Sequence, residues 1–248
     1  MIGSANEELK IYLNKILTDQ VREPADPPPL GLLLSNQTIQ NTSHSSEIEP
    51  ASVQFEIKDQ LIQTQLRGCN ENEIVRLVQL QDSIQNIVTI QPSIVDGEGI
   101  VQIYLRFEDL LEHERGLRWF GIVDSNFPIR NKYDPQEQYA CASFCGDDGN
   151  IVHASVQTSL KCIFTGKQYK NGDIVMAEVN MGLDREQRTL HFFVGDTQMP
   201  ISFKGLPSSI KFFVHRRDLG TSVSILRMQK VTVAKAVQNQ RFPEAFQW

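Results

Sequence analysis

Histidines, cysteines and clustered carboxylates are the residue types from which a catalytic or metal site would be built. The five histidines are His44, His113, His153, His191 and His215. No pair of them has the HExxH spacing or another spacing typical of metal ligands. Three fall in or near expected strands, where alternation alone can place a residue on the solvent-exposed face without any chemical role. The histidines therefore favour neither a metal centre nor acid–base catalysis.

The cysteines give no better support for catalysis. They are Cys69, Cys141, Cys145 and Cys162. They lack paired CxxC spacing and are expected to be free thiols. Cys141 and Cys145 lie in the run 139–145, and if this run is a strand, their Cα atoms are about 13 Å apart at roughly 3.3 Å per residue, which excludes a disulfide between them. The sequence has no GxSxG elbow, and GDDGN at 146–150 fits a hairpin turn better than a calcium loop. We expect no enzyme activity and no cofactor.

Residues suited to binding gather instead in an irregular segment, SNFPIRNKYDPQEQ, at 125–138. The segment is too long for a tight turn, and large or charged side chains in such loops are typical of interfaces. The candidate partner-binding residues are Phe127, Ile129, Arg130, Lys132 and Tyr133. The alternative is that Phe127 and Tyr133 anchor the loop to their own domain. Arg216 and Arg217 form a second candidate at a basic loop tip, which an ordinary solvated turn also explains.

The charge and hydropathy of the sequence exclude two classes of partner. Thirty acidic and 24 basic side chains give a formal charge of −6, and no run of Lys and Arg could neutralise a nucleic-acid backbone. No apolar stretch approaches the ~20 residues that cross a bilayer. Residues 1–20 are too polar for the core of a signal peptide. We therefore expect a cytoplasmic protein that binds neither nucleic acid nor a membrane, with an oligomeric state that the sequence does not indicate.

The chain divides into four expected segments, and these contain the elements that position the candidate residues. Residues 1–22 contain an amphipathic helix with Leu9, Leu13, Ile16 and Leu17 at helical spacing. This helix either docks on its own domain or binds another chain. Residues 23–50, rich in Pro, Ser and Asn, read as a flexible linker. Residues 51–233 form the main domain, and 234–248 a C-terminal tail.

The main domain has the two-residue periodicity of β-strands. At 101–107, apolar residues alternate with Gln102, Tyr104 and Arg106, which are expected on the solvent-exposed face of a strand. At 189–194, Leu190, Phe192 and Val194 occupy every second position in the same way. Further strands are expected at 53–57, 74–80, 86–90, 117–123, 140–144, 151–154, 173–179, 210–214 and 222–226. The sequences DGEG, GDDGN, NGD and GD punctuate these runs with turn residues. More than ten short strands predict an all-β, antiparallel sandwich, because open sheets of that size pack their apolar faces together.

Four motifs in this order resemble the second half of a SPRY domain: WFGIVDSN at 119–126, YKNGDIVMAEVNM at 169–181, RTLHFFVGDTQMPISF at 188–203 and LPSSIKFFV at 206–214. The resemblance covers roughly Ala51 to Val233, and before Leu117 it rests on the strand pattern alone. It implies a bent, concanavalin-like jelly-roll sandwich that binds protein partners through loops at one edge, usually without a cofactor. No known peptide-binding set of the family maps onto this sequence residue by residue.

The sequence therefore predicts a non-catalytic, adaptor-type module that recognises a peptide or loop of a protein partner. A carbohydrate-binding or carbohydrate-cleaving sandwich of the lectin kind is the alternative. Asp124, Glu178 and Asp184 could converge, as carboxylates do by chance in any sandwich, but the required aromatic platform is not evident among Gln102, Tyr104 and Arg106. A third possibility is a scaffold whose N-terminal helix is the active part.

Overall fold

The computed structural model describes residues 51–54, 62–67, 74–79, 86–108, 118–126, 140–154, 161–165, 167–216, 221–237 and 245–248. The helix expected within 1–22 and the linker of 23–50 lie outside the described residues. The chain divides into Met1–Ser46 and Glu47–Trp248, and the described residues all belong to the second unit. Within them, every regular element is a strand except one 3-10 turn, η2, at Arg185–Gln187.

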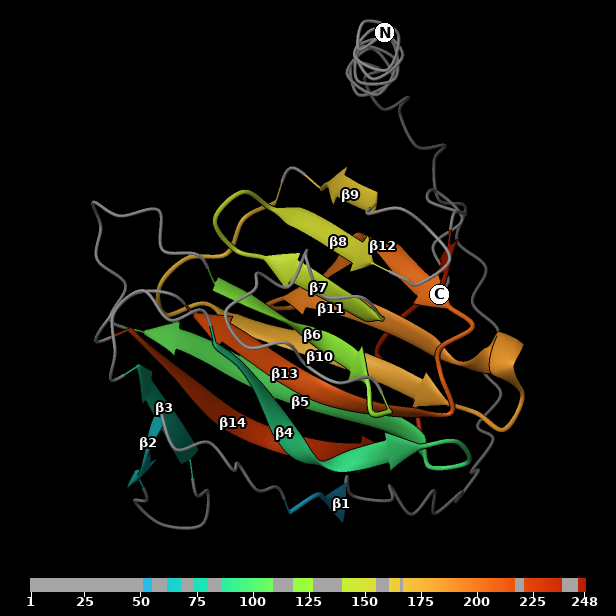
Figure 1. The fold of residues 1–248 in the computed structure, drawn as a ribbon, viewed down its shortest axis with the longest axis horizontal. Coiled ribbons are helices and arrows are strands. Elements are labelled where there is room, and N and C mark those ends of the chain that lie inside the picture. Colours follow the sequence, from blue (N-terminus) through green and yellow to red (C-terminus); the bar gives the residue numbers. More distant parts are fainter. Residues whose placement is uncertain are drawn as a thin grey trace, which may run out of the picture. The chain divides into compact units, whose positions relative to one another are not determined.

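A nine-stranded sheet forms one layer of this unit (Figure 1). Its order is β15-β12-β11-β10-β5-β14-β3-β2, and β1 also pairs with β14. All pairs are antiparallel except β12 with β15. The strands are β1 (Ala51–Ser52), β2 (Ile62–Arg67), β3 (Ile74–Gln79), β5 (Gly99–Glu108), β10 (Ile174–Met181), β11 (Thr189–Val194), β12 (Thr197–Lys204), β14 (Ser222–Val231) and β15 (Ala245–Gln247).

A six-stranded antiparallel sheet forms the other layer, in the order β4-β13-β6-β7-β8-β9. Its strands are β4 (Asn86–Val95), β6 (Arg118–Asp124), β7 (Cys141–Cys145), β8 (Asn150–Ala154), β9 (Lys161–Phe164) and β13 (Ser209–Arg216). Together the two sheets confirm the predicted all-β, antiparallel sandwich.

The core lies between the sheets because alternate residues of each strand point inward. Val101, Ile103, Leu105 and Phe107 of β5 are at most 1% exposed, as their alternation predicts. They share one apolar cluster with residues of the six-stranded sheet such as Phe120. An aromatic group forms its centre, with ring centroids 5.3–5.9 Å apart: Phe120, Phe144, Tyr169 and Phe192. Burial of these apolar faces is the main force that holds the two layers together.

Hairpin turns join the antiparallel strands where the sequence predicts them. Gly195 and Asp196 form a two-residue loop between the paired residues Val194 and Thr197. Gly195 has a φ of 58°, a left-handed conformation that such loops require and that glycine adopts without a steric cost. The turns at 96–98 and 146–149 likewise connect β4 to β5 and β7 to β8.

Several strands differ from the expected ones. β4 runs on to Val95, past Pro92, and a register irregularity between Ile210 and Phe212 lies opposite this part of the strand. Strands β2, β9, β12 and β15 were not expected from the alternation. The predicted strand at 53–57 is described only at 53–54, which follow β1 and are not in a strand.

The last four residues of the chain are part of the sandwich. β15 pairs in parallel with β12, with Phe246 beside Phe203, so that β15 is the edge strand and the C-terminus lies next to β12 (Figure 1). The ring of Trp248 lies 5.1 Å from that of His153, which belongs to β8 of the other sheet. This end of the expected tail therefore contacts both sheets.

Candidate functional site

One end of the sandwich is made of connections that hold one another through their backbones. Asp96 N donates to Ser208 O at 2.8 Å, and Gly97 N donates to Met181 O at 2.8 Å. Ser125 N donates to Ser209 O at 3.0 Å, which brings the end of β6 to the same place. We call this end, formed by residues 96–98, 125–126, 182–188 and 205–208, the loop end.

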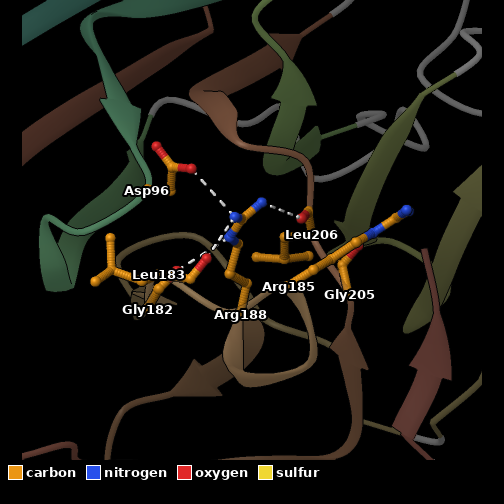
Figure 2. Close-up of polar contacts among 7 residues, drawn as sticks. All are labelled: Asp96, Gly182, Leu183, Arg185, Arg188, Gly205 and Leu206. Carbon is orange, nitrogen blue, oxygen red and sulfur yellow. Dashed lines mark hydrogen bonds and ion pairs between the residues drawn. The ribbon is translucent and has the colours of Figure 1, made fainter.

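Arg188 ties three of these connections together, as Figure 2 shows. Its side chain is buried and donates to the carbonyl oxygens of Gly182 at 3.0 Å, Leu183 at 2.8 Å and Leu206 at 3.3 Å. Its Nη2 also forms a 3.2 Å ion pair with Asp96, whose side chain is 43% exposed. The planar guanidinium offers five donors in a fixed arrangement, so it can satisfy acceptors from several directions at once. The loop end is therefore held as one rigid surface.

Exposed side chains project from this rigid backbone. Leu183 is 76% exposed, although Arg188 fixes its carbonyl group. Its Cδ2 lies only 3.1 Å from the point where a Cβ on Gly97 would be, so its side chain extends over the 96–98 turn. Arg185 is exposed as well, and its Nε donates to Gly205 O at 3.0 Å. An apolar and a cationic side chain are thus both attached to this fixed frame, Leu183 over the 96–98 turn and Arg185 at Gly205.

The residues that the sequence singles out for binding at 127–133 lie outside the described residues. The chain leaves the loop end after Asn126 and returns at Ala140, whose carbonyl accepts from Asp124 N at 3.0 Å. Ala140 has a φ of 59°, a left-handed conformation that costs a residue with a Cβ about 1–2 kcal/mol. Such strain is retained where the surroundings impose it, and it often accompanies functional loops.

The second candidate patch, Arg216 and Arg217, lies where the chain leaves the six-stranded sheet at the opposite end from the loop end. Arg216 is the last residue of β13 and pairs with Arg118, whereas Asp124 pairs with Ile210 near the start of that strand. The eight residues of β13 span about 23 Å, so the departure points of the two predicted patches are that far apart. The side chain of Arg216 and the whole of Arg217 lie outside the described part.

A second polar arrangement, which no sequence motif predicts, lies on the outer face of the nine-stranded sheet. Residues 232–237, which we call the strap, follow β14. Both oxygens of Glu178 accept from it: Oε2 from Lys235 N at 2.8 Å and Oε1 from Ala236 N at 2.9 Å. Gln102 Nε2 donates to Oε2 at 2.6 Å, and Glu178 is only 2% exposed. The expected wet-face residue Gln102 is buried here, at 3% exposure.

Neighbouring side chains complete this arrangement. Gln198 accepts from Val237 N at 2.9 Å and donates to Val237 O at 3.1 Å. Its Nε2 also lies 3.4 Å from Nδ1 of His191, the cross-strand partner of Glu178. Burial lowers the pKa of His191, and the Glu178 carboxylate opposes this effect. The neutral form of the ring is therefore favoured near pH 7, and its Nδ1 can accept from Gln198 Nε2 in the tautomer that carries the proton on Nε2.

The carboxylates that a carbohydrate site would need, Asp124, Glu178 and Asp184, do not converge. The Glu178 carboxylate accepts three N–H donors on the outer face of the nine-stranded sheet. Asp124 belongs to the other sheet, where its Oδ1 accepts from Asn126 N at 2.9 Å, and Asp184 is exposed in the loop before η2. Among the described residues, no group of three or more His, Cys, Asp or Glu side chains is placed to hold a metal ion.

Comparisons with known proteins add the following findings. No protein-family model matches the sequence, and no curated protein sequence matches it either. The SPRY domain of human HERC1 is similar in structure at 11% identity and a TM-score of 0.48, over 72% of this chain and 100% of that one. Another human SPRY domain matches at 13% identity and a TM-score of 0.47, over 71% and 97%. The carbohydrate recognition domain of Emp46p matches at 12% identity and 0.44, over 71% and 87%.

SPRY domains are among the solved structures to which this chain is similar. The fold class itself rests on the two sheets. Among the described residues, the structure contains no helix long and apolar enough to span a membrane.

Proposed function

We propose that this sandwich is a non-catalytic protein-binding module, and that it recognises a peptide or loop of a partner at its loop end. Leu183 carries the proposal, because its side chain is 76% exposed while Arg188 fixes its backbone. An apolar anchor on a preorganised frame binds without the entropic cost of ordering a loop. Arg185, two residues further on, supplies a cation of the type enriched at interface hot spots.

The segment 127–133 belongs to the same proposed surface. Its chain leaves the loop end at Asn126 and returns at Ala140. Phe127, Ile129, Arg130, Lys132 and Tyr133 would extend the surface with the aromatic and cationic groups that interfaces favour. Arg216 and Arg217 leave from the other end of β13 and form a separate candidate.

A binding role also agrees with the way in which the chain itself satisfies its buried ionic side chains. Arg188 and Glu178 are each surrounded by hydrogen-bond partners from the chain itself. Buried charges arranged in this way position loops and strands. This supports a rigid recognition surface in preference to a carbohydrate site built around Glu178.

Selection of ligands from a displayed peptide library tests the proposal. Peptides enriched on the full chain are synthesised, and their affinities are measured by calorimetry. Leu183→Ala combined with Arg185→Ala is expected to weaken binding by at least about tenfold, as loss of hot-spot residues does. Arg130→Ala combined with Tyr133→Ala is expected to act in the same direction.

Lys170→Ala is the matched control. Lys170 is exposed in the turn before β10, and this turn is bonded to Phe107 near the far end of β5. Its affinity should stay within about twofold of the wild type, as expected of a residue outside the interface. Equal binding by all variants would place the site elsewhere. A glycan array that yields a ligand when no peptide is enriched would favour the carbohydrate alternative.

A further inference from the structure

The strap is held on the sheet almost entirely through its main chain. Its apolar side chains at Val233 and Val237 are 78% and 66% exposed, so their burial does not hold the segment in place. The contacts are instead the amides of Lys235 and Ala236 on Glu178, and both main-chain polar groups of Val237 on Gln198. A carboxylate that accepts consecutive amides and a carboxamide that pairs with one residue are means of recognising a peptide backbone.

One side chain of the strap is also recognised. The Nζ of Lys235 forms a 2.8 Å ion pair with Asp196. The same Nζ lies 5.5 Å from the ring centroid of Phe193, within the range of a cation–π contact. The aromatic ring is 1% exposed and belongs to β11, whereas Asp196 is in the two-residue turn that follows. Lysine is therefore selected by both charge and ring contact.

The receiving surface is organised by contacts that do not involve the strap. Gln102 donates to Glu178, and its own Oε1 accepts from Tyr104 Oη at 3.0 Å and from Gln229 Nε2 at 2.8 Å. These residues come from β5, β10 and β14, three neighbouring strands. With its orientation fixed by the sheet, the carboxylate stays in place when the strap departs, and it then lacks two of its three donors.

We propose that this face is a second peptide-binding site, built from Glu178, Gln198, Asp196 and Phe193, which the chain's own residues 235–237 fill as an internal ligand. A partner segment with a lysine followed by two residues other than proline binds there in place of the strap. Proline is excluded because the second and third residues must both donate their N–H groups. This site is separate from the loop end, so either can fail without the other.

The internal ligand competes with any partner at an effective concentration on the order of millimolar, as is typical for a short flexible connection. A free peptide with the same contacts will therefore bind the wild-type chain weakly. Weakening the strap without altering the receiving surface should expose the site. Ala236→Pro does this, since it removes the amide that donates to Glu178 Oε1.

The experiment uses the full chain and a fluorescent peptide, Thr-Val-Ala-Lys-Ala-Val-Gln, with blocked ends. The Ala236→Pro chain is expected to bind this peptide at least about tenfold more tightly than the wild type, because the internal competitor is weakened. Adding Glu178→Gln or Gln198→Ala to Ala236→Pro should abolish this gain. Because Gln198 is only half-buried, the second combination is informative even if the first does not fold. A peptide with glutamate in place of lysine should not bind.

Ala234→Pro is the matched control, since Ala234 is exposed and lies just before the contact. Its affinity for the peptide should match that of the wild type. Hydrogen exchange supplies an independent measurement: the amides of Lys235, Ala236 and Val237 should be protected in the wild type, and those of Lys235 and Val237 should lose protection in Ala236→Pro. Unprotected amides in the wild type overturn the proposal. So does an Ala236→Pro chain that binds the peptide no better than the wild type.

Discussion

Tyr169 and Arg118 are joined by hydrogen bonds that run in both directions. The hydroxyl of Tyr169 donates to the carbonyl oxygen of Arg118 at 2.9 Å, and Nε of Arg118 donates to the carbonyl oxygen of Tyr169 at 3.0 Å. The guanidinium carbon lies 5.3 Å from the centroid of the Tyr169 ring. The pair therefore fixes the segment before β10 to the beginning of β6 and places a fully buried ring in the aromatic core.

Tyr169→Phe should lower the free energy of unfolding by about 1–1.5 kcal/mol, because it removes a buried hydrogen bond to the carbonyl oxygen of Arg118, which keeps Gly146 N as its other donor. Urea denaturation measures the change. Tyr104→Phe is the matched control, since Tyr104 also donates from its hydroxyl but lies half-buried on the outer face. Its effect should be below about 1 kcal/mol. Equal losses in both variants would contradict the role assigned to the Tyr169 hydroxyl.

Arg188→Lys should lower the free energy of unfolding by about 2–3 kcal/mol, although it keeps the charge. A lysine ammonium cannot reach the Gly182, Leu183 and Leu206 carbonyls together with Asp96. Arg185→Ala is the comparison, since Arg185 is exposed and its side chain donates to Gly205 O. We expect less than about 1 kcal/mol for it. An Arg188→Lys chain as stable as the wild type would show that the loop end does not depend on the guanidinium.

His191 should make the domain less stable as the pH falls below neutrality. Burial lowers its pKa in the folded state below the ordinary 6.5, so the unfolded chain binds the proton more tightly. The free energy of unfolding therefore decreases as the pH drops through 6.5 and levels off below the folded-state pKa. Urea denaturation at pH 7.5 and 5.5 should show a smaller difference for His191→Gln than for the wild type. An unchanged difference would mean that His191 titrates normally.

Cys141 and Cys145 should resist alkylation in the folded protein. Both are buried in β7. Burial raises the pKa of Cys141 to about 12 and that of Cys145 further still, which leaves very little thiolate. Iodoacetamide at pH 8 should modify them at least about 100-fold more slowly than a free thiol, and at normal rates in urea. Site-resolved mass spectrometry separates them from the other two cysteines, and rapid native labelling of either would contradict their burial.

The strands predicted from the sequence are those in which buried apolar residues alternate with exposed ones along the chain. Val101 to Phe107 face the core at every second position, so the pattern indicates both the strand and its buried face. β12 has the same alternation in Met199, Ile201 and Phe203, but Pro200 interrupts it, and a proline inside a strand reads as a break. β15 is only three residues long, and its pairing depends on β12, which is more than 40 positions away.

The strap site could not be predicted for a related reason. Glu178 receives its amides from residues 57 and 58 positions further along the chain, and no local pattern links them. The alternation predicts that Gln102 is exposed to solvent, and its burial becomes evident only once the strap and Glu178 are in place. At the loop end, the Arg188–Asp96 pair spans 92 positions. Sequence reasoning places the turns at this end and cannot foresee the side chain that joins them.

The order of strands has a consequence for how the chain reaches its native state. β14, which begins at Ser222, lies between β5 and β3, and β13, which begins at Ser209, lies between β4 and β6. An interior strand of each sheet is thus supplied from residues beyond 208, and neither sheet is continuous until these strands insert. Such non-local pairing slows folding, on the order of milliseconds to seconds for all-β domains. During synthesis on the ribosome, the earlier strands emerge with exposed edges and apolar faces, which are prone to aggregation until β13 and β14 arrive.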